Sequence, residues 1–163
     1  PTRRSSDLEG KWLKMSDRDP FDYCRIERKI PASKELKVAF DIKADQNDKG
    51  LLQIEFLDEN SIACAHIDLN PDGTMLSKGG ARYGKLLNYE AGKSYHVEVI
   101  LSVSKRMSEV FIDGKKAGQR MFFAPVAAIE RIAFRTGERR TFPPLILLPI
   151  GTVHWQMLVN KSH

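Results

Sequence analysis

The chain has 163 residues, 42% hydrophobic and 29% charged, a composition that indicates a folded globular domain and excludes a disordered or collagen-like chain. Its net charge of +5, from 26 basic and 21 acidic residues, is spread along the sequence, which excludes the clustered basic stripe expected of a nucleic-acid-binding protein. No run of 18 apolar residues is present, so the sequence predicts no membrane span, and no signal peptide opens it.

The two ends of the chain are expected to lie outside the fold. Residues 1–8 resemble the translation of a common sequencing adapter, and we interpret them as a non-native leader. After Pro143 the composition changes to an apolar run interrupted by Pro149, and a two-base shift of the reading frame would give a polar linker there. We therefore expect one domain over residues 9–143 and a frameshifted tail over 144–163, whose deletion changes the stability by less than about 1 kcal/mol.

The body of the chain alternates apolar and polar residues at every second position, which predicts strands with one buried face and one solvent-facing side. The alternating segments, in chain order, are residues 35–44, 51–57, 62–69, 95–103, 108–112 and 129–135. Turn-forming clusters separate them, including Asn70-Pro-Asp-Gly73 and Asp113-Gly114. This pattern predicts an all-β fold, an antiparallel two-sheet β-sandwich of the jelly-roll type.

Metal and redox chemistry find little support in the sequence. Asp68 to Gly73 begins like a calcium-binding EF-hand loop, but Gly79 stands where the bidentate Glu belongs, and a hairpin turn fits better. We expect no cofactor, with an irregular structural calcium site as the open alternative. Cys24 and Cys64 lack metal-type spacing, so they are interpreted either as buried thiols or as a disulfide.

The sequence contains no catalytic carboxylate pair of the kind that a jelly-roll glycanase carries on one strand. Glu55 and Glu59 share a strand face by parity, but Glu59 lies in a turn cluster. We therefore predict no independent enzymatic activity. His66 and His96 each alternate with apolar residues, so both are expected on the solvent side of their strands.

Two donor-rich segments are candidates for glycan binding: Arg82 and Tyr83 in a glycine-rich loop over residues 79–84, and Arg135 with Arg139 after the last predicted strand. Guanidinium groups suit the carboxylates of acidic sugars, and an aromatic face stacks on a pyranose ring. The alternative for the arginines is a solvated turn that docks on a neighbouring domain. Other aromatic residues considered for stacking are Trp12, for which packing is the better interpretation, and Tyr89.

The segment from Tyr89 to Val99, followed by Val110 to Lys115, resembles the concanavalin A-like lectin/glucanase superfamily in its laminin-G-type branch. In that branch a Gly-x-Trp/Tyr-His-Val strand leads to a hydrophobic-x-Val-Asp-Gly hairpin. Tyr95 stands here for the usual Trp and Ile112 for the usual Val. The Asp-Gly pair supplies a primed hairpin turn.

The resemblance is closer to modules of bacterial polysaccharide-degrading proteins, carried by Trp12 to Pro20 and by Glu130 to Pro143. It implies a noncatalytic carbohydrate-binding or scaffolding module beside a catalytic domain, in the periplasm or outside the cell, with a polysaccharide or oligosaccharide as ligand. Two alternatives stay open. The chain is part of an active glycoside hydrolase or polysaccharide lyase and contributes to a shared cleft, or it is a structural spacer without a ligand.

Overall fold

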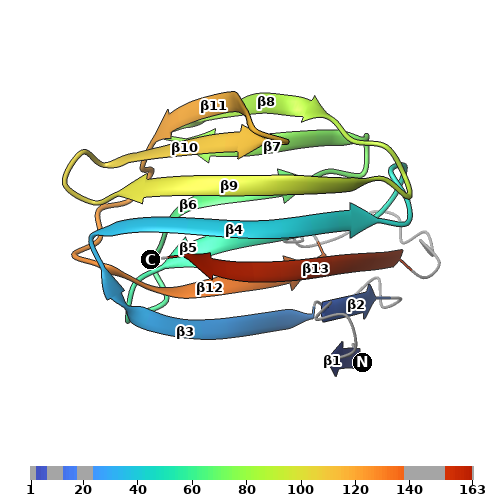
Figure 1. Cartoon of the computed structure of the whole chain (residues 1–163), viewed down its shortest axis with the longest axis horizontal. Helices are drawn as coiled ribbons and strands as arrows, with labels where there is room; N and C mark the ends of the chain where they lie inside the picture. Colours follow the sequence, from blue (N-terminus) through green and yellow to red (C-terminus); the bar gives the residue numbers. More distant parts are fainter. Residues whose placement is uncertain (1–2, 7–12, 18–23, 138–152, 163) are drawn as a thin grey trace, which may run out of the picture.

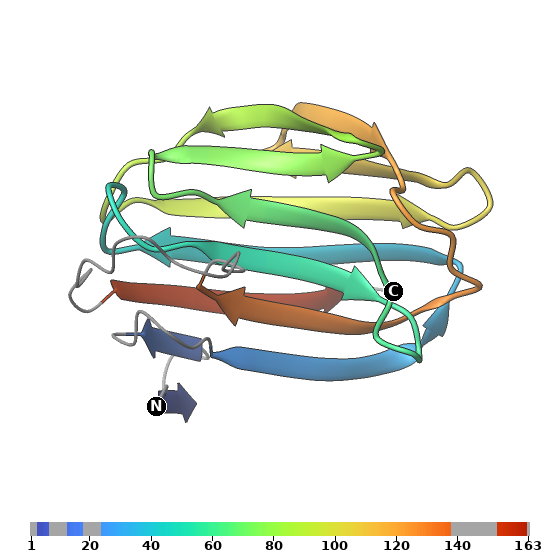
Figure 2. The same cartoon turned by 180° about the vertical axis from the view of Figure 1, so that it is seen from behind.

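The computed structural model describes residues 3–6, 13–17, 24–137 and 153–162, which form two antiparallel sheets packed face to face (Figures 1 and 2). The seven-stranded sheet has the order β1 (Arg3–Ser6), β2 (Leu13–Asp17), β13 (Val153–Ser162), β4 (Glu35–Ala44), β9 (Ser94–Ser102), β10 (Met107–Ile112), β11 (Lys115–Met121). The six-stranded sheet has the order β3 (Arg25–Ser33), β12 (Ile129–Thr136), β5 (Leu52–Leu57), β6 (Ala63–Leu69), β7 (Thr74–Gly79), β8 (Arg82–Asn88). The predicted jelly-roll β-sandwich is confirmed, and the described residues contain no helix.

The alternation of the sequence sets which side chains enter the core between the sheets. In β4, Val38, Phe40 and Ile42 are buried, while Lys37 and Asp41 have the opposite parity and point to the other face. The Phe40 ring meets Phe134 of β12 edge to face, with centroids 6.1 Å apart, so an aromatic pair joins the two sheets. The same parity rule places Gln53, Glu55, His66 and Arg135 on the outer face of the six-stranded sheet.

Two turns behave as their sequences predict. Asp113 and Gly114 both have positive φ, 51° and 83°, which is the primed turn expected between β10 and β11. In the β6–β7 connection, Gly73 has φ 83° and the Asp72 carboxylate accepts a hydrogen bond from the Thr74 backbone N–H at 3.0 Å. This segment is therefore a hairpin turn. No group of three or more His, Cys, Asp or Glu side chains that could hold a metal ion occurs among the described residues.

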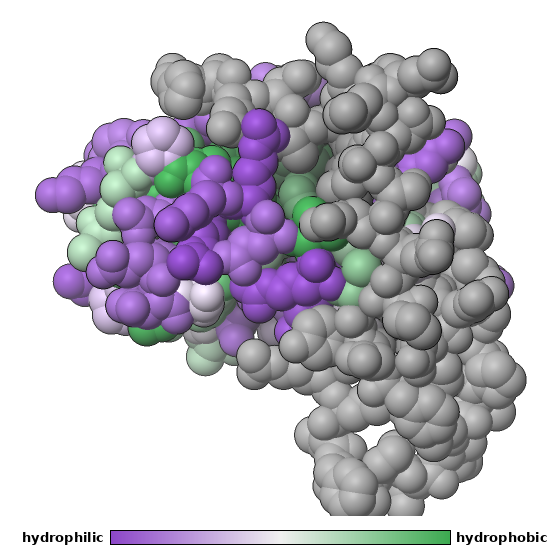
Figure 3. Space-filling view, turned by 90° about the horizontal axis from the view of Figure 1, so that it is seen from below, coloured by the Kyte–Doolittle hydropathy of each residue, from purple (hydrophilic) through white to green (hydrophobic). Residues whose placement is uncertain are grey.

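Strand β3 forms an edge of the six-stranded sheet and carries exposed charges, with Arg25, Glu27, Arg28 and Lys29 on it. The Glu27 carboxylate pairs with Arg131 of β12 at 2.7 Å. Charged side chains on an edge strand discourage pairing with a second chain. Figure 3, seen from the side of β3, shows that hydrophilic residues dominate the described part of this surface.

The structure differs from the expectation at both chain ends. Residues 153–162 form β13, which lies inside the seven-stranded sheet and pairs with β4 and β2, although residues 144–163 were expected to lie outside the fold. Residues 3–6 form β1, which pairs with β2 alone. The physical reason is that the edge of β4 offers unpaired backbone donors and acceptors, which any extended segment can satisfy. Residues 144–152 lie outside the described residues.

The two cysteines are not joined in a disulfide, and both are buried. The sequence left a disulfide and two buried thiols as alternatives, and the structure shows two buried thiols. Burial raises the pKa of the Cys64 thiol to about 12. Such a thiol stays protonated and unreactive at neutral pH.

The glycine-rich segment over residues 79–84 is the tip of the β7–β8 hairpin, where Gly80 has φ 58°. Its glycines leave room for the Arg120 side chain of β11. A Cβ atom at Gly79 would meet the Arg120 Cδ and Cγ atoms at 2.9 and 3.0 Å and its Cβ closer still. A Cβ atom at Gly84 would meet the guanidinium end of the same side chain.

We expect Gly79→Ala to lower the free energy of unfolding by about 1–3 kcal/mol, the usual cost of overpacking, because the stem of Arg120 cannot move without β11. Gly84→Ala is the matched control and should cost less, since the guanidinium can swing away. Urea unfolding of both variants measures the difference. Equal costs at the two positions would contradict this account, as would a failure of Arg120→Ala to relieve the Gly79→Ala defect.

Candidate functional site

A pocket of about 570 Å³ opens on the outer face of the six-stranded sheet. Its floor comes from β12, β5 and β6, and its far side from β7 and β8, the strands that face the viewer in Figure 2. The strand register gives two rows of side chains across this face. One row is Arg135, Gln53, Asp68 and Leu76, and the other is Glu55, His66, Lys78 and Tyr83. All eight line the pocket.

His66 lies on the outer face as its parity predicts, but it is only 7% exposed, so the expectation of a solvent-facing histidine is wrong. The connection between β11 and β12 covers it. The Phe123 backbone N–H donates to the Cys64 carbonyl of β6 at 3.0 Å, and the Phe123 ring meets the His66 ring with centroids 5.2 Å apart. His66 Nδ1 lies 2.7 Å from Asp68 Oδ1, so the buried Asp68 carboxylate holds the imidazole in place.

Glu55 is the second buried acidic side chain of the pocket, with 8% of its surface exposed. Its Oε1 atom is buried and has no hydrogen-bond partner among the described residues. Because unpaired buried carboxylate oxygens are rare and destabilising, this atom marks a place where a donor from outside the chain would be accommodated.

Two cations stand on opposite sides of the pocket. Arg135, which is 7% exposed, donates from Nη1 to Gln53 Oε1 at 3.5 Å. The Lys78 ammonium lies 4.7 Å from the centre of the Phe123 ring and 5.7 Å from that of Tyr83. Cation–π contact therefore holds Lys78 between two aromatic rings.

Tyr83 forms the exposed rim of the pocket, with half of its surface accessible. Its ring lies 5.9 Å from that of His66. Burial, and to a lesser degree the Asp68 carboxylate, raises the pKa of the Tyr83 hydroxyl, which therefore stays protonated at neutral pH. The residue offers an accessible ring face and a hydroxyl donor to a ligand.

Of the four residues predicted to bind a ligand, the structure brings Tyr83 and Arg135 together in this pocket. Arg82 is exposed and is not part of the lining, because its side chain has the opposite parity to that of Tyr83. Arg139, like Trp12, lies outside the described residues. Tyr89 is buried and its hydroxyl donates to the Asn70 carbonyl, so the interpretation of Tyr89 as a sugar-stacking residue is wrong.

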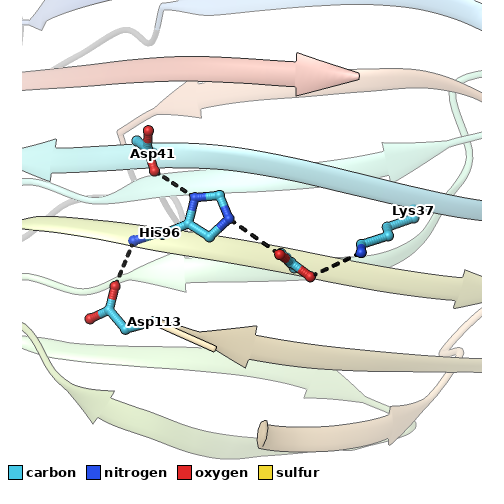
Figure 4. A network of polar contacts seen from close by, with 5 residues as sticks. Lys37, Asp41, His96 and Asp113 are labelled. Atoms are coloured by element: carbon cyan, nitrogen blue, oxygen red, sulfur yellow. Dashed lines mark hydrogen bonds and ion pairs between the residues drawn. The ribbon is translucent and has the colours of Figure 1, made fainter. Parts of the chain in front are cut away.

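A second histidine, His96 of β9, belongs to a polar network on the outer face of the seven-stranded sheet (Figure 4). Its Nδ1 lies 2.7 Å from Asp41 Oδ1, and its Nε2 lies 3.3 Å from Glu98, which also pairs with Lys37 at 3.3 Å. Asp113 accepts a hydrogen bond from the His96 backbone N–H at 3.0 Å. As expected from the sequence, this histidine is partly solvent-exposed, at 40% of its side chain.

The network makes stability depend on pH. The hydrogen bond to Asp41 has the largest effect and raises the pKa of His96 above its ordinary value. Burial opposes it with the second-largest effect, and the hydrogen bond to Glu98 adds a smaller increase. A raised folded-state pKa stabilises the fold fully below about pH 6.5, the usual pKa of His, and this stabilisation is lost as the pH rises through the elevated value. Because the side chain is well exposed, we expect a loss below about 1 kcal/mol.

An NMR titration of the His96 ring, together with urea unfolding on both sides of neutrality, measures this effect. Asp41→Asn should bring the His96 pKa back toward its ordinary value, and Asp45→Asn, which alters an exposed carboxyl outside the network, should leave it raised. A His96 pKa at or below about 6.5 in the unaltered protein would contradict the assignment.

Comparison with known proteins places the fold. A family model described as "Sialidase-like, CBM domain" matches residues 1–146. The solved structure of a sialidase is 56% identical with a TM-score of 0.86, and the match covers 95% of this chain but 16% of that protein. The chain thus spans about a sixth of the sialidase. No curated protein sequence shows significant similarity.

More distant structures share the fold alone. The β-glucanase of Bacillus licheniformis has a TM-score of 0.69 at 9% identity, with 98% of this chain and 82% of that one covered. An alginate lyase from Corynebacterium sp. has a TM-score of 0.66 at 7% identity, with 98% and 81% covered. Together with the sheet topology, these similarities confirm the predicted jelly-roll fold of the concanavalin A-like type.

Proposed function

Since the chain belongs to the family of sialidase-like carbohydrate-binding-module (CBM) domains, we propose that it is a noncatalytic module which binds a glycan in the pocket on its six-stranded sheet. It would serve a longer, exported, glycan-active protein by holding the substrate near a catalytic domain. The short coverage of the similar sialidase supports a modular role. No helix in the described part of the chain is long and apolar enough to cross a bilayer.

The observation that carries this proposal is the combination of side chains in one pocket. An accessible aromatic ring, Tyr83, stands at the rim, and fixed polar groups lie below it: Glu55, the His66–Asp68 pair and Arg135. Sugar-binding sites need this combination, because a pyranose offers apolar C–H faces for stacking and hydroxyl groups for hydrogen bonds.

The noncatalytic part of the proposal rests on how the acidic groups are used. Glu55 and Asp68 lie on neighbouring strands, but Asp68 is held by His66 at 2.7 Å, and both carboxylates are at least nine-tenths buried. A retaining glycosidase needs one carboxylate free to attack the sugar and a second free to deliver a proton. An Asp68 committed to His66 is poorly placed for either role.

We expect glycan binding with a dissociation constant in the millimolar to high-micromolar range, about 4–5 kcal/mol, from one stacking contact and one or two charge-assisted hydrogen bonds. Isothermal titration against a panel of neutral and uronic-acid oligosaccharides measures it. Tyr83→Ala and Arg135→Ala should each weaken binding about tenfold. Arg82→Ala is the matched control and should leave binding unchanged, because Arg82 is outside the pocket lining.

Two outcomes would overturn the proposal. If no oligosaccharide of the panel binds, the chain is better explained as a structural spacer. Turnover of any panel member that is abolished by Glu55→Gln would make the chain part of an active glycoside hydrolase or lyase.

A further inference from the structure

The floor of the pocket presents a carboxylate oxygen, Glu55 Oε1, to which no described residue donates a hydrogen bond. Glu55 is 8% exposed, and its buried Oε1 atom has no partner within the part of the chain that the structure describes. An ionised carboxylate can only accept hydrogen bonds. The unliganded protein therefore leaves this oxygen unsatisfied, and a ligand that donates to it removes the cost.

A second acceptor lies directly opposite on the next strand. His66 and Glu55 are register partners in the β5–β6 ladder. His66 Nδ1 lies 2.7 Å from Asp68 Oδ1, and the Nδ1–H tautomer, which donates to this carboxylate, keeps Nε2 as an acceptor. Directly opposite residues in an antiparallel pair have Cβ atoms about 4.5–5.5 Å apart, so one sugar ring can reach both groups.

The cations of the pocket do not create a site for an anion at this floor. Lys78 is engaged with the Phe123 and Tyr83 rings, and Arg135 donates to Gln53. Among the described residues of the lining, these two cations balance the carboxylates of Glu55 and Asp68. A ligand carboxylate placed over the floor would meet two negative groups at close range.

We propose that the pocket selects an uncharged hexopyranose, which donates two neighbouring hydroxyl groups to Glu55 Oε1 and His66 Nε2, and that it rejects the matching uronic acid. Glu55 is then the residue that determines specificity. This inference rests on the proposed carbohydrate binding and names the class of sugar. It also explains why this buried carboxylate oxygen has no hydrogen-bond donor among the residues that the structure describes.

The test uses the full chain and matched pairs of sugars: the methyl glycosides of glucose, galactose and mannose, each beside its uronic acid. Chemical-shift titration by NMR follows weak binding. We expect at least one neutral glycoside to bind about tenfold or more tightly than its uronic acid, with little effect of added NaCl. Glu55→Gln should weaken that binding about tenfold, and Glu109→Gln, on the opposite sheet, should not.

The melting temperature without sugar separates a binding role from a structural one. Removing an unpaired buried charge should leave the melting temperature of Glu55→Gln equal to or above that of the unaltered chain, whereas loss of a structural contact would lower it. Equal or tighter binding of the uronic acids would overturn the inference while the proposed glycan binding stands. So would unchanged binding by Glu55→Gln alongside weakened binding by Tyr83→Ala. If no sugar binds, both proposals fail.

Discussion

Truncation after Pro143 should lower the free energy of unfolding by about 5 kcal/mol or more. Eight residues of β13 pair with β4 and five with β2, and each net backbone hydrogen bond contributes about 0.5–1.5 kcal/mol. Without β13, strand β2 keeps only β1 as a partner and is cut off from β4, so the buried side chain of Met15 loses its place in the core. Against a total stability of about 5–15 kcal/mol, such a loss unfolds much of the population.

Urea unfolding and size-exclusion chromatography of the truncated chain test this expectation. The freed edge of β4 should also promote self-association. Val159→Pro supplies a variant of full length, because Val159 pairs with Phe40 and a proline there removes a donor from the strand. A truncated chain within about 1 kcal/mol of the full one would instead support a tail outside the fold.

Phe40→Ala is the substitution of a single residue with the largest expected effect. Phe40 is fully buried, and its ring contacts Phe134 on the facing sheet. Replacing a core phenylalanine by alanine costs about 3–5 kcal/mol through lost burial and the cavity left behind. The loss falls on the contact between the two sheets, so the near-UV circular dichroism should change as well.

Phe111→Ala provides the control for the same chemical change. Phe111 is only partly buried in β10, and it is not a member of the core between the sheets. Its replacement should cost about 1 kcal/mol, in proportion to the smaller apolar area removed from water. Denaturant unfolding of the two variants side by side measures the contrast. Similar losses would show that the Phe40–Phe134 contact contributes little to the joining of the sheets.

Most central strands could be predicted from the sequence because their alternation has a physical cause. A residue in β4, β5, β6 or β9 faces either the core or the outside, and each of these strands repeats that choice every second position. Strand β3 was not predicted, since its polar, exposed residues alternate weakly at the edge of a sheet. Edge strands are held by backbone pairing, which leaves little trace in side-chain pattern.

Strand β13 shows a different reason for a missed element. Val153, Trp155, Met157 and Val159 alternate with His154, Gln156 and Asn160, the same signal as in β4. The prolines and the apolar run just before this segment favour a tail outside the fold, and they hide the alternation that follows. In the structure this segment nevertheless pairs with β4, whose backbone groups need a neighbouring strand on that side.

The candidate site was predicted in part, by residues whose chemistry is conspicuous: Tyr83 and Arg135. The burial of His66 could not be predicted, because it depends on Phe123, more than fifty positions later in the sequence. Glu55 was noticed as a weak catalytic candidate. Its unpaired oxygen depends on the side chains of neighbouring strands, and strand periodicity carries no information about them.

The alkylation rate of the buried Cys64 thiol reports how often the sandwich opens locally. A thiol without solvent access and with a pKa of about 12 can be alkylated only in molecules whose sandwich has separated locally, so the labelling rate counts opening events. The Cys64 carbonyl also holds the Phe123 backbone, which covers the pocket. A sugar that stabilises this wall therefore slows alkylation at a sulfur atom that it never touches.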